Sequence, residues 1–153
     1  MIRRRLLAGL GLAITLIAVA RPRTSYAGAS PDALAFADLY SAQTVRGLEL
    51  SPRTRALAGK PVRMLGYMAP PLKPDVDFFV LTRAPVALCP FCNSDADWPS
   101  DIVVVYPRER GQWAEDGLAV AVAGVFDVGA RVDARTGFVS LIRIIDASVQ
   151  TLR

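Results

Sequence analysis

The 153 residues suffice for one domain with a hydrophobic core and are too few for two, once an N-terminal leader is set aside. The sequence has no histidine, which argues against most hydrolase and mononuclear metal mechanisms, because histidine is the commonest general base near neutral pH and the commonest metal ligand. Five of the 18 basic residues lie in the first 27 positions, so the remainder carries 13 basic against 14 acidic residues and lacks the basic stripe that nucleic-acid binding requires.

The N-terminus has the pattern of a secretion signal. Arg3–Arg5 precede an uncharged apolar run over residues 6–20, which is too short to span a bilayer comfortably. Ser25-Tyr26-Ala27 places small residues where signal peptidase would cut, leaving Gly28 as the new N-terminus. An uncleaved anchor is the alternative, and the paired arginines leave both the twin-arginine and the general secretory route open. We therefore expect residues 1–27 to be a signal peptide and the mature protein to be periplasmic or secreted, meeting the membrane only through this signal.

Two helices are predicted ahead of the main domain. Ser30-Pro31-Asp32 has the order of an N-cap, a first-turn proline and an acidic first turn, and apolar residues follow at helical spacing, which predicts a helix over 31–42. Ser51-Pro52 repeats the start signal and Gly59 supplies a stop, which predicts a second, short helix. We therefore divide the mature chain into an N-terminal helical segment over 28–58 and a β domain over 59–153.

From Pro61 onward, short apolar runs separated by turn residues are typical of strands. The strands are predicted over residues 62–68, 77–83, 102–106, 118–126 and 138–145. The third is an unbroken β-branched run that predicts burial on both faces, and Asp133–Gly137 predicts a hairpin turn. Gly66 and Gly124, inside strand patterns, are predicted bend points. The pattern favours a mainly β fold, a small five-stranded barrel of the oligonucleotide/oligosaccharide-binding (OB) type, with a β-sandwich as the alternative.

Cys89 and Cys92 are the two cysteines of the sequence, and a disulfide between them is the first of three interpretations. An exported chain meets an oxidising environment, where a disulfide would stabilise the loop between the second and third strands. The second interpretation is a metal site, because the spacing fits half of a structural zinc site. Asp95 and Asp97, or a second chain, would then supply the remaining ligands for zinc or copper.

The third interpretation is thiol–disulfide exchange, with Cys89 as the attacking sulfur. Cys-Pro-x-Cys occurs in thioredoxin-like oxidoreductases, where the first cysteine lies at a helix N-terminus that lowers its pKa. No βαβ pattern surrounds Cys89 and Cys92 in this sequence, so the motif lacks that structural context.

Residues 59–70 contain the motif GK-x-V-R-x-x-G-Y-x-x-P, which a cysteine-containing loop and the valine-rich strand Ile102–Val105 follow. With these features the chain resembles, over residues 36–145, a bacterial family of exported proteins that carry a domain of unknown function. In that family the loop often continues from cysteine to histidine, whereas Cys92 stands at this point here. The resemblance implies an OB-like exported accessory protein, sometimes associated with transport systems, and therefore an unidentified protein or transporter as partner.

The sequence thus predicts an exported, non-enzymatic binding or accessory protein, metal-associated or transport-linked, without catalytic residues and without a certain cofactor. The Cys89/Cys92 loop would be its functional or stabilising element. The alternative function is that of a periplasmic thiol–disulfide redox protein that uses the same pair. A homodimer that shares one site between two chains is a further option.

Overall fold

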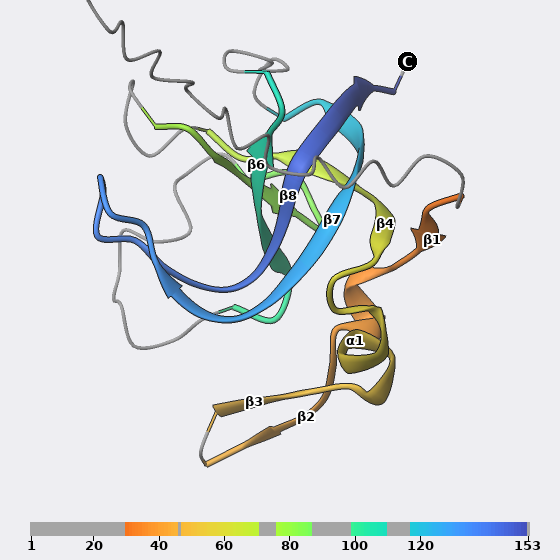
Figure 1. Ribbon diagram of the computed structural model, residues 1–153, viewed down its shortest axis with the longest axis vertical. Coiled ribbons are helices and arrows are strands. Elements are labelled where there is room, and N and C mark those ends of the chain that lie inside the picture. Colours follow the sequence, from red (N-terminus) through yellow and green to blue (C-terminus); the bar gives the residue numbers. More distant parts are fainter. Residues whose placement is uncertain (1–29, 46, 71–75, 87–98, 110–116, 153) are drawn as a thin grey trace, which may run out of the picture.

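The computed structural model (Figure 1) describes residues 30–45, 47–70, 76–86, 99–109 and 117–152. The described part is mainly β, with one short α-helix. Its elements are β1 (Asp32–Ala33), the 3-10 helix η1 (Phe36–Asp38), β2 (Tyr40–Thr44), β3 (Gly47–Leu50), α1 (Pro52–Leu57), β4 (Pro61–Met68), β5 (Phe79–Thr82), β6 (Ile102–Pro107), β7 (Ala119–Val132) and β8 (Val139–Thr151). Within these ranges no helix has the length and apolar character needed to cross a membrane.

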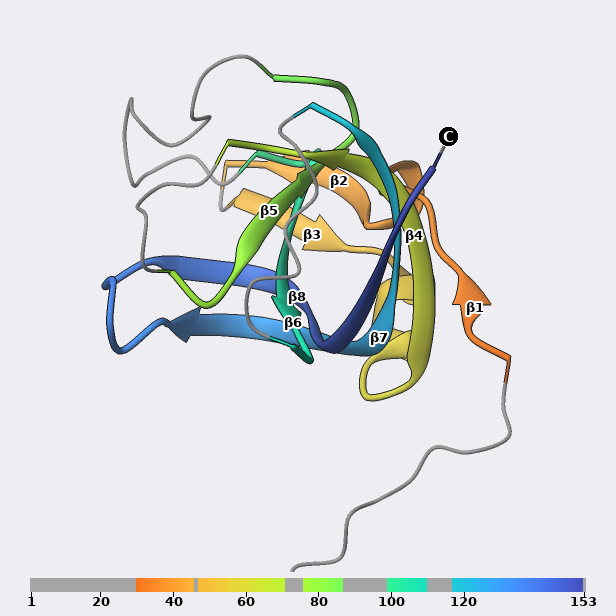
Figure 2. The ribbon, with the colours of Figure 1, turned by 90° about the horizontal axis from the view of Figure 1, so that it is seen from above.

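Five strands form a ring of backbone pairings. The sheet order is β1-β4-β5-β6-β8-β7. An additional antiparallel pairing joins β7, at the end of this order, to β4, so that the five strands from β4 to β7 form a closed ring. In the ring, β6 and β8 run parallel and the other neighbours antiparallel. Figure 2 shows these strands around a common core. The prediction of a mainly β fold is confirmed, and the ring is compatible with the predicted barrel-like form as well as with its sandwich-like alternative.

The core lies inside this ring. Along β4 the side chains alternate, with Val62 and Met64 buried and Arg63 and Leu65 facing outward. In β6 all four residues from Ile102 to Val105 are buried, which confirms the predicted burial on both faces. β7 and β8 are longer than predicted. The predicted Asp133–Gly137 turn joins them, and Gly137 has a positive φ of 73°. The main cluster also contains Phe126, Ile142 and Ile144, together with Leu34, Phe36 and Leu39 from the N-terminal segment.

Gly66 and Gly124 allow neighbouring strands to approach closely. A Cβ atom on Gly66 would lie 2.7 Å from the Thr82 carbonyl oxygen, and one on Gly124 would lie 2.7 Å from that of Ile145. The β7–β8 register also shifts between Ala123 and Val125, so Gly124 lies in a β-bulge. A bulge bends its strand, which agrees with the bend predicted at this glycine.

The predicted helix over 31–42 is wrong. Residues 32–33 form β1, which pairs in parallel with β4, and the Leu34 N–H donates to the Arg63 carbonyl at 3.0 Å. A single 3-10 turn follows, and residues 40–44 then form β2. Leu34 and Phe36 are buried while Ala35 between them is exposed, so this segment follows the period of a strand. Burial against the ring therefore outweighs the local helix-start signal.

The second predicted helix is confirmed as α1. The Ser51 hydroxyl accepts a hydrogen bond from the Thr54 N–H at 3.0 Å, and Pro52 occupies the first turn. Gly59, just beyond the end of the helix, has a φ of 78°. Figure 1 shows α1 between the ring and the β2–β3 hairpin, which projects away from the ring.

Candidate functional site

Cys89, Cys92, Asp95 and Asp97 lie outside the described residues, so the disulfide, metal and redox interpretations stay predictions. The connection that carries them joins β5 to β6, which are adjacent antiparallel strands rather than the parallel strands of a βαβ unit. Its base is fixed by a hydrogen bond from the Arg83 N–H to the Asp101 carbonyl at 3.1 Å. Among the residues that the structure describes, no group of three or more cysteine and acidic side chains is placed to hold a metal ion.

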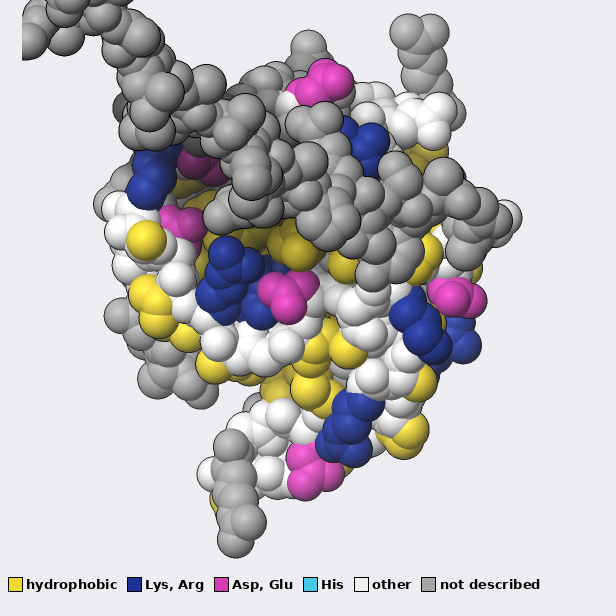
Figure 3. Space-filling view, in the orientation of Figure 1, with side chains coloured by type: hydrophobic (Ala, Val, Ile, Leu, Met, Phe, Trp, Pro, Cys, Tyr) yellow, Lys and Arg dark blue, Asp and Glu magenta, His cyan; other side chains and the backbone are white. Residues whose placement is uncertain are grey.

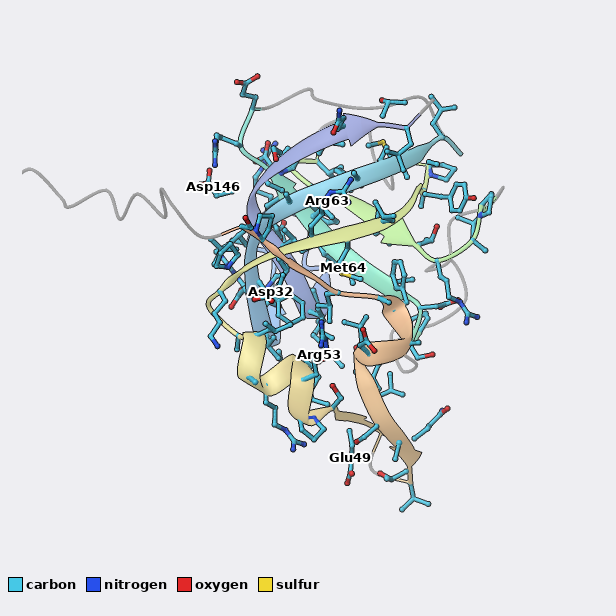
Figure 4. All side chains as sticks on the ribbon, turned by 90° about the vertical axis from the view of Figure 1, so that its right-hand side faces the viewer. Asp32, Glu49, Arg53, Arg63, Met64 and Asp146 are labelled. Carbon is cyan, nitrogen blue, oxygen red and sulfur yellow. The ribbon has the colours of Figure 1, made fainter. Side chains whose placement is uncertain are left out.

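A groove lies between residues 33–38 and β4. Its volume of ≈ 480 Å³ is in the range of sites that bind small ligands. The apolar part of its lining includes Leu34, Phe36 and the 52% exposed side chain of Leu65. Figure 4 looks at this side of the molecule and labels Arg63 on β4 and Asp32 in the segment beside it. The remaining lining residues are Ala33, Ala35, Ala37, Asp38, Arg63 and Arg83.

The wall formed by residues 33–38 is held in place from α1. Arg53 Nη2 donates to the Ala33 carbonyl at 2.7 Å, and its Nε lies 3.7 Å from the Asp38 carboxylate. Thr54 Oγ1, which is buried, donates to the Leu39 carbonyl at 2.8 Å. The short helix therefore fixes the position of this wall relative to β4, although it does not line the groove itself.

Within the described residues, two guanidinium groups at the groove have no carboxylate partner. Arg63 and Arg83 both line it and are exposed, and neither forms an ion pair within the described part of the chain. The acidic residue of the lining, Asp38, is paired with Arg53 instead. Figure 3 shows another face, on which basic, acidic and apolar side chains are interspersed. The groove thus combines an apolar surface with uncompensated positive charge, which suits an anionic ligand with an apolar part.

A second cluster joins the β7–β8 turn to the residues before β5. Phe78 packs on Tyr106 and on Phe138, with ring centroids 5.4 Å apart in both pairs. Arg135 in the turn forms an ion pair with Asp77 at 2.6 Å. In OB folds, ligands bind near the loops at the equivalent positions, which here are the segment before β5 and the β7–β8 turn. Here the charged groups neutralise each other across the loops, so this cluster serves to hold the two loops together.

Tyr106 and Asp133 form the polar edge of that cluster. Burial raises the pKa of Tyr106 to about 12, and the charge of Asp133, whose carboxylate accepts the phenolic hydrogen bond at 3.1 Å, adds to this rise. Burial opposes ionisation of Asp133, but hydrogen bonds from Thr136, Tyr106 and the Arg135 backbone outweigh it and hold the pKa of Asp133 below its usual value. Both groups are therefore kept in their ordinary protonation states at neutral pH.

The groove was not predicted from the sequence, because its lining comes from three separate segments of the chain. Two signals were present. Arg63, which belongs to the motif over residues 59–70, faces outward from a strand whose alternate residues are buried. The alternation of Leu34 and Phe36 with small alanines indicated a segment with one buried face.

Comparisons with known proteins bear on the fold. No protein-family model matches the sequence, and no curated protein matches it. The structure is similar to the crystal structure of a DUF3299 family protein from Pseudomonas aeruginosa, with a TM-score of 0.54 and 17% sequence identity. The similarity covers 82% of this chain and 98% of that one. At this identity the likeness concerns the fold alone, and it fits the resemblance to a bacterial domain of unknown function.

Proposed function

We propose that this chain is an exported, non-enzymatic binding or accessory protein that holds an anionic, partly apolar ligand in the groove between residues 33–38 and β4. The observation that carries the proposal is the pair Arg63 and Arg83, two guanidinium groups without carboxylate partners beside an apolar surface in the described structure. A ligand that buries apolar area there and also supplies an anion gains from both contacts.

Export and the cysteine pair complete the proposal. The basic and apolar pattern of residues 1–27 supports delivery to the periplasm, where a transporter or another protein would be the partner. In that compartment Cys89 and Cys92 would form a disulfide within the β5–β6 connection. Because Arg83 lies at the base of that connection and also lines the groove, the disulfide would stabilise one wall of the binding site.

The groove is tested by titrating the purified protein with 8-anilinonaphthalene-1-sulfonate, an anionic aromatic probe whose fluorescence rises in apolar surroundings. We expect saturable binding that weakens by about tenfold in Arg63→Glu, where attraction becomes repulsion. Arg55→Glu is the matched control, since Arg55 is exposed on α1 and does not line the groove. Equal affinities for the two variants would show that the groove is not the binding site.

The cysteine interpretations are tested separately. The redox alternative requires a depressed thiol pKa at Cys89, measured from the pH dependence of its alkylation rate in the reduced protein; a pKa near 8.5 would remove this function. Elemental analysis of protein purified from the periplasm tests for zinc or copper. Mass spectrometry of the same sample tests export, with a chain that begins at Gly28 as the expected result.

A further inference from the structure

We infer that the ligand of this groove is a small linear dianion, an unbranched apolar chain with a carboxylate at each end. The inference rests on the proposed binding function and specifies its ligand class. Arg63 belongs to β4, whereas Arg83 directly follows β5, and both line the groove. Their positions along the sheet, and the apolar surface between them, indicate a ligand that is charged at both ends.

The strand register gives the separation of the two arginines. β5 pairs antiparallel with β4 as far as Thr82, which lies opposite Tyr67. The next residue, Arg83, therefore lies beside Gly66, three residues along β4 from Arg63. A strand advances about 3.3 Å per residue and its neighbour is about 4.8 Å away, so the Cα atoms of the two arginines are roughly 11 Å apart. The two positive charges also repel each other, which opposes their convergence on one point.

Both arginines extend from a fixed backbone. Arg63 is paired with β1 on one edge of its strand and with β7 on the other. The Arg83 N–H donates to the Asp101 carbonyl at 3.1 Å, and the hydroxyl of the preceding Thr82 donates to the Ala84 carbonyl at 2.7 Å. The spacing of the two charges is therefore set by the sheet and by the hydrogen bonds at its end.

The surface between these charges is apolar. Leu65 lies two residues beyond Arg63 on the outward face of β4, and its side chain is 52% exposed. Asp38, the acidic residue of the lining, accepts from the Ala35 N–H at 3.2 Å and is paired with Arg53, so its charge is already compensated. A hydrocarbon spacer can bury apolar area here while its two ends reach the arginines. The facing wall adds the exposed alanines Ala33, Ala35 and Ala37.

Ligands with a single charged group use this arrangement less completely. A fatty acid that places its carboxylate at Arg63 would extend its chain over Leu65 toward Arg83, whose guanidinium would then lose water to hydrocarbon without gaining an anion. A small inorganic anion would leave the apolar surface uncovered. A carboxylate at each end of an apolar spacer gives both guanidinium groups a partner and covers the surface between them.

The test compares linear dicarboxylates with monocarboxylates of the same chain length on the purified protein, by displacement of the fluorescent probe. In a series from butanedioate to dodecanedioate, we expect the affinity to be highest at octanedioate or decanedioate, whose ends can span the two arginines. Decanedioate should bind at least about tenfold more tightly than decanoate. This length series uses the unchanged protein, so it does not depend on how any variant folds.

Variants then assign the two ends of the ligand. Arg63→Gln and Arg83→Gln should each reduce the preference for decanedioate over decanoate to about twofold or less, because one carboxylate loses its partner. Arg55→Gln should keep the full preference, since Arg55 is exposed on α1 and does not line the groove.

The outcomes separate this inference from the proposed function. Decanoate that displaces the probe as well as decanedioate does would overturn the inference and leave the proposed function standing. Butanedioate that binds as tightly as decanedioate would show that the arginines converge on one point, which would also overturn it. Failure of both the probe and all carboxylates to bind would refute the proposed function itself.

Discussion

Replacing Asp127 by alanine should strongly destabilise the protein, because it leaves a buried positive charge without its carboxylate. The side chain of Arg143 is 3% exposed, and its Nε donates to Asp127 Oδ2 at 2.7 Å. Its Nη1 donates to the carbonyl and the hydroxyl of Ser140 at 2.8 and 2.9 Å. After the substitution Ser140 still accepts hydrogen bonds from the guanidinium, but it cannot neutralise the charge.

The size of the effect follows from burial. Removing one partner of a buried ion pair costs about 3–5 kcal/mol, and the side chain of Asp127 is 33% exposed, which places this pair at the lower end, near 3 kcal/mol. For a chain of this size that corresponds to a fall in Tm of roughly 10 °C. Adding Arg143→Met to the Asp127→Ala variant removes the uncompensated charge while keeping an apolar side chain, so we expect the double variant to regain about 2 kcal/mol.

The free energy of unfolding is measured from urea denaturation followed by circular dichroism. Arg108→Ala is the control, because Arg108 belongs to a solvent-exposed ion pair with Asp146 at 2.9 Å, and its loss should leave the free energy of unfolding nearly unchanged. A loss below about 1 kcal/mol in Asp127→Ala would refute the reasoning. So would a double variant that is no more stable than Asp127→Ala alone.

Three further predictions concern single residues. Because Tyr106 has a folded pKa of about 12 against 10.0 for the ordinary phenol, the unfolded state ionises first, and the free energy of unfolding should fall between these pH values. After discounting for partial exposure this loss is about 1 kcal/mol, and it should disappear in Tyr106→Phe when urea midpoints are compared across that range. Gly66→Ala should lower the free energy of unfolding, measured by thermal unfolding, by about 1–3 kcal/mol, because its Cβ would collide with the Thr82 carbonyl oxygen. Unchanged stability would show that β4 and β5 can move apart at this point without cost. Ser51→Ala should cost about 1–2 kcal/mol in urea denaturation, because the hydroxyl accepts from the Thr54 N–H as the N-cap of α1 and also donates to the Asp38 carbonyl. Ser51→Asp, which can cap the helix but cannot donate to that carbonyl, should not restore this loss.

The strands could be predicted because their signals are local. The β-branched run of β6 and the hairpin turn at Asp133–Gly137 each depend on residues adjacent in the sequence. The helix predicted over 31–42 failed because its start signal, Pro31 and Asp32, is also local, whereas the burial of Leu34 and Phe36 depends on a ring formed by residues much later in the chain. Local patterns therefore gave the wrong result where long-range burial opposed them.

The candidate site was less predictable than the fold. From the sequence, Cys89 and Cys92 were the candidate site residues, because two closely spaced cysteines can be recognised from residue type and spacing alone. The groove instead depends on which arginines lack a carboxylate partner, and that cannot be read from residue types. Arg53 and Arg63 have the same side chain, but Arg53 pairs with Asp38 whereas Arg63 has no such partner in the described structure.

The closure of the ring sets a constraint on how the chain acquires its structure during synthesis. Val62 of β4 pairs with Gly124 of β7, and β5 and β6 lie between the two along the chain. At ordinary translation rates about 60 residues take roughly 3–12 s to emerge, so β4 must wait that long for its partner. During this interval its apolar residues Met64 and Met68 have no complete core to enter. A chaperone that covers this segment of the nascent chain would protect the protein at the stage when it is most prone to aggregate.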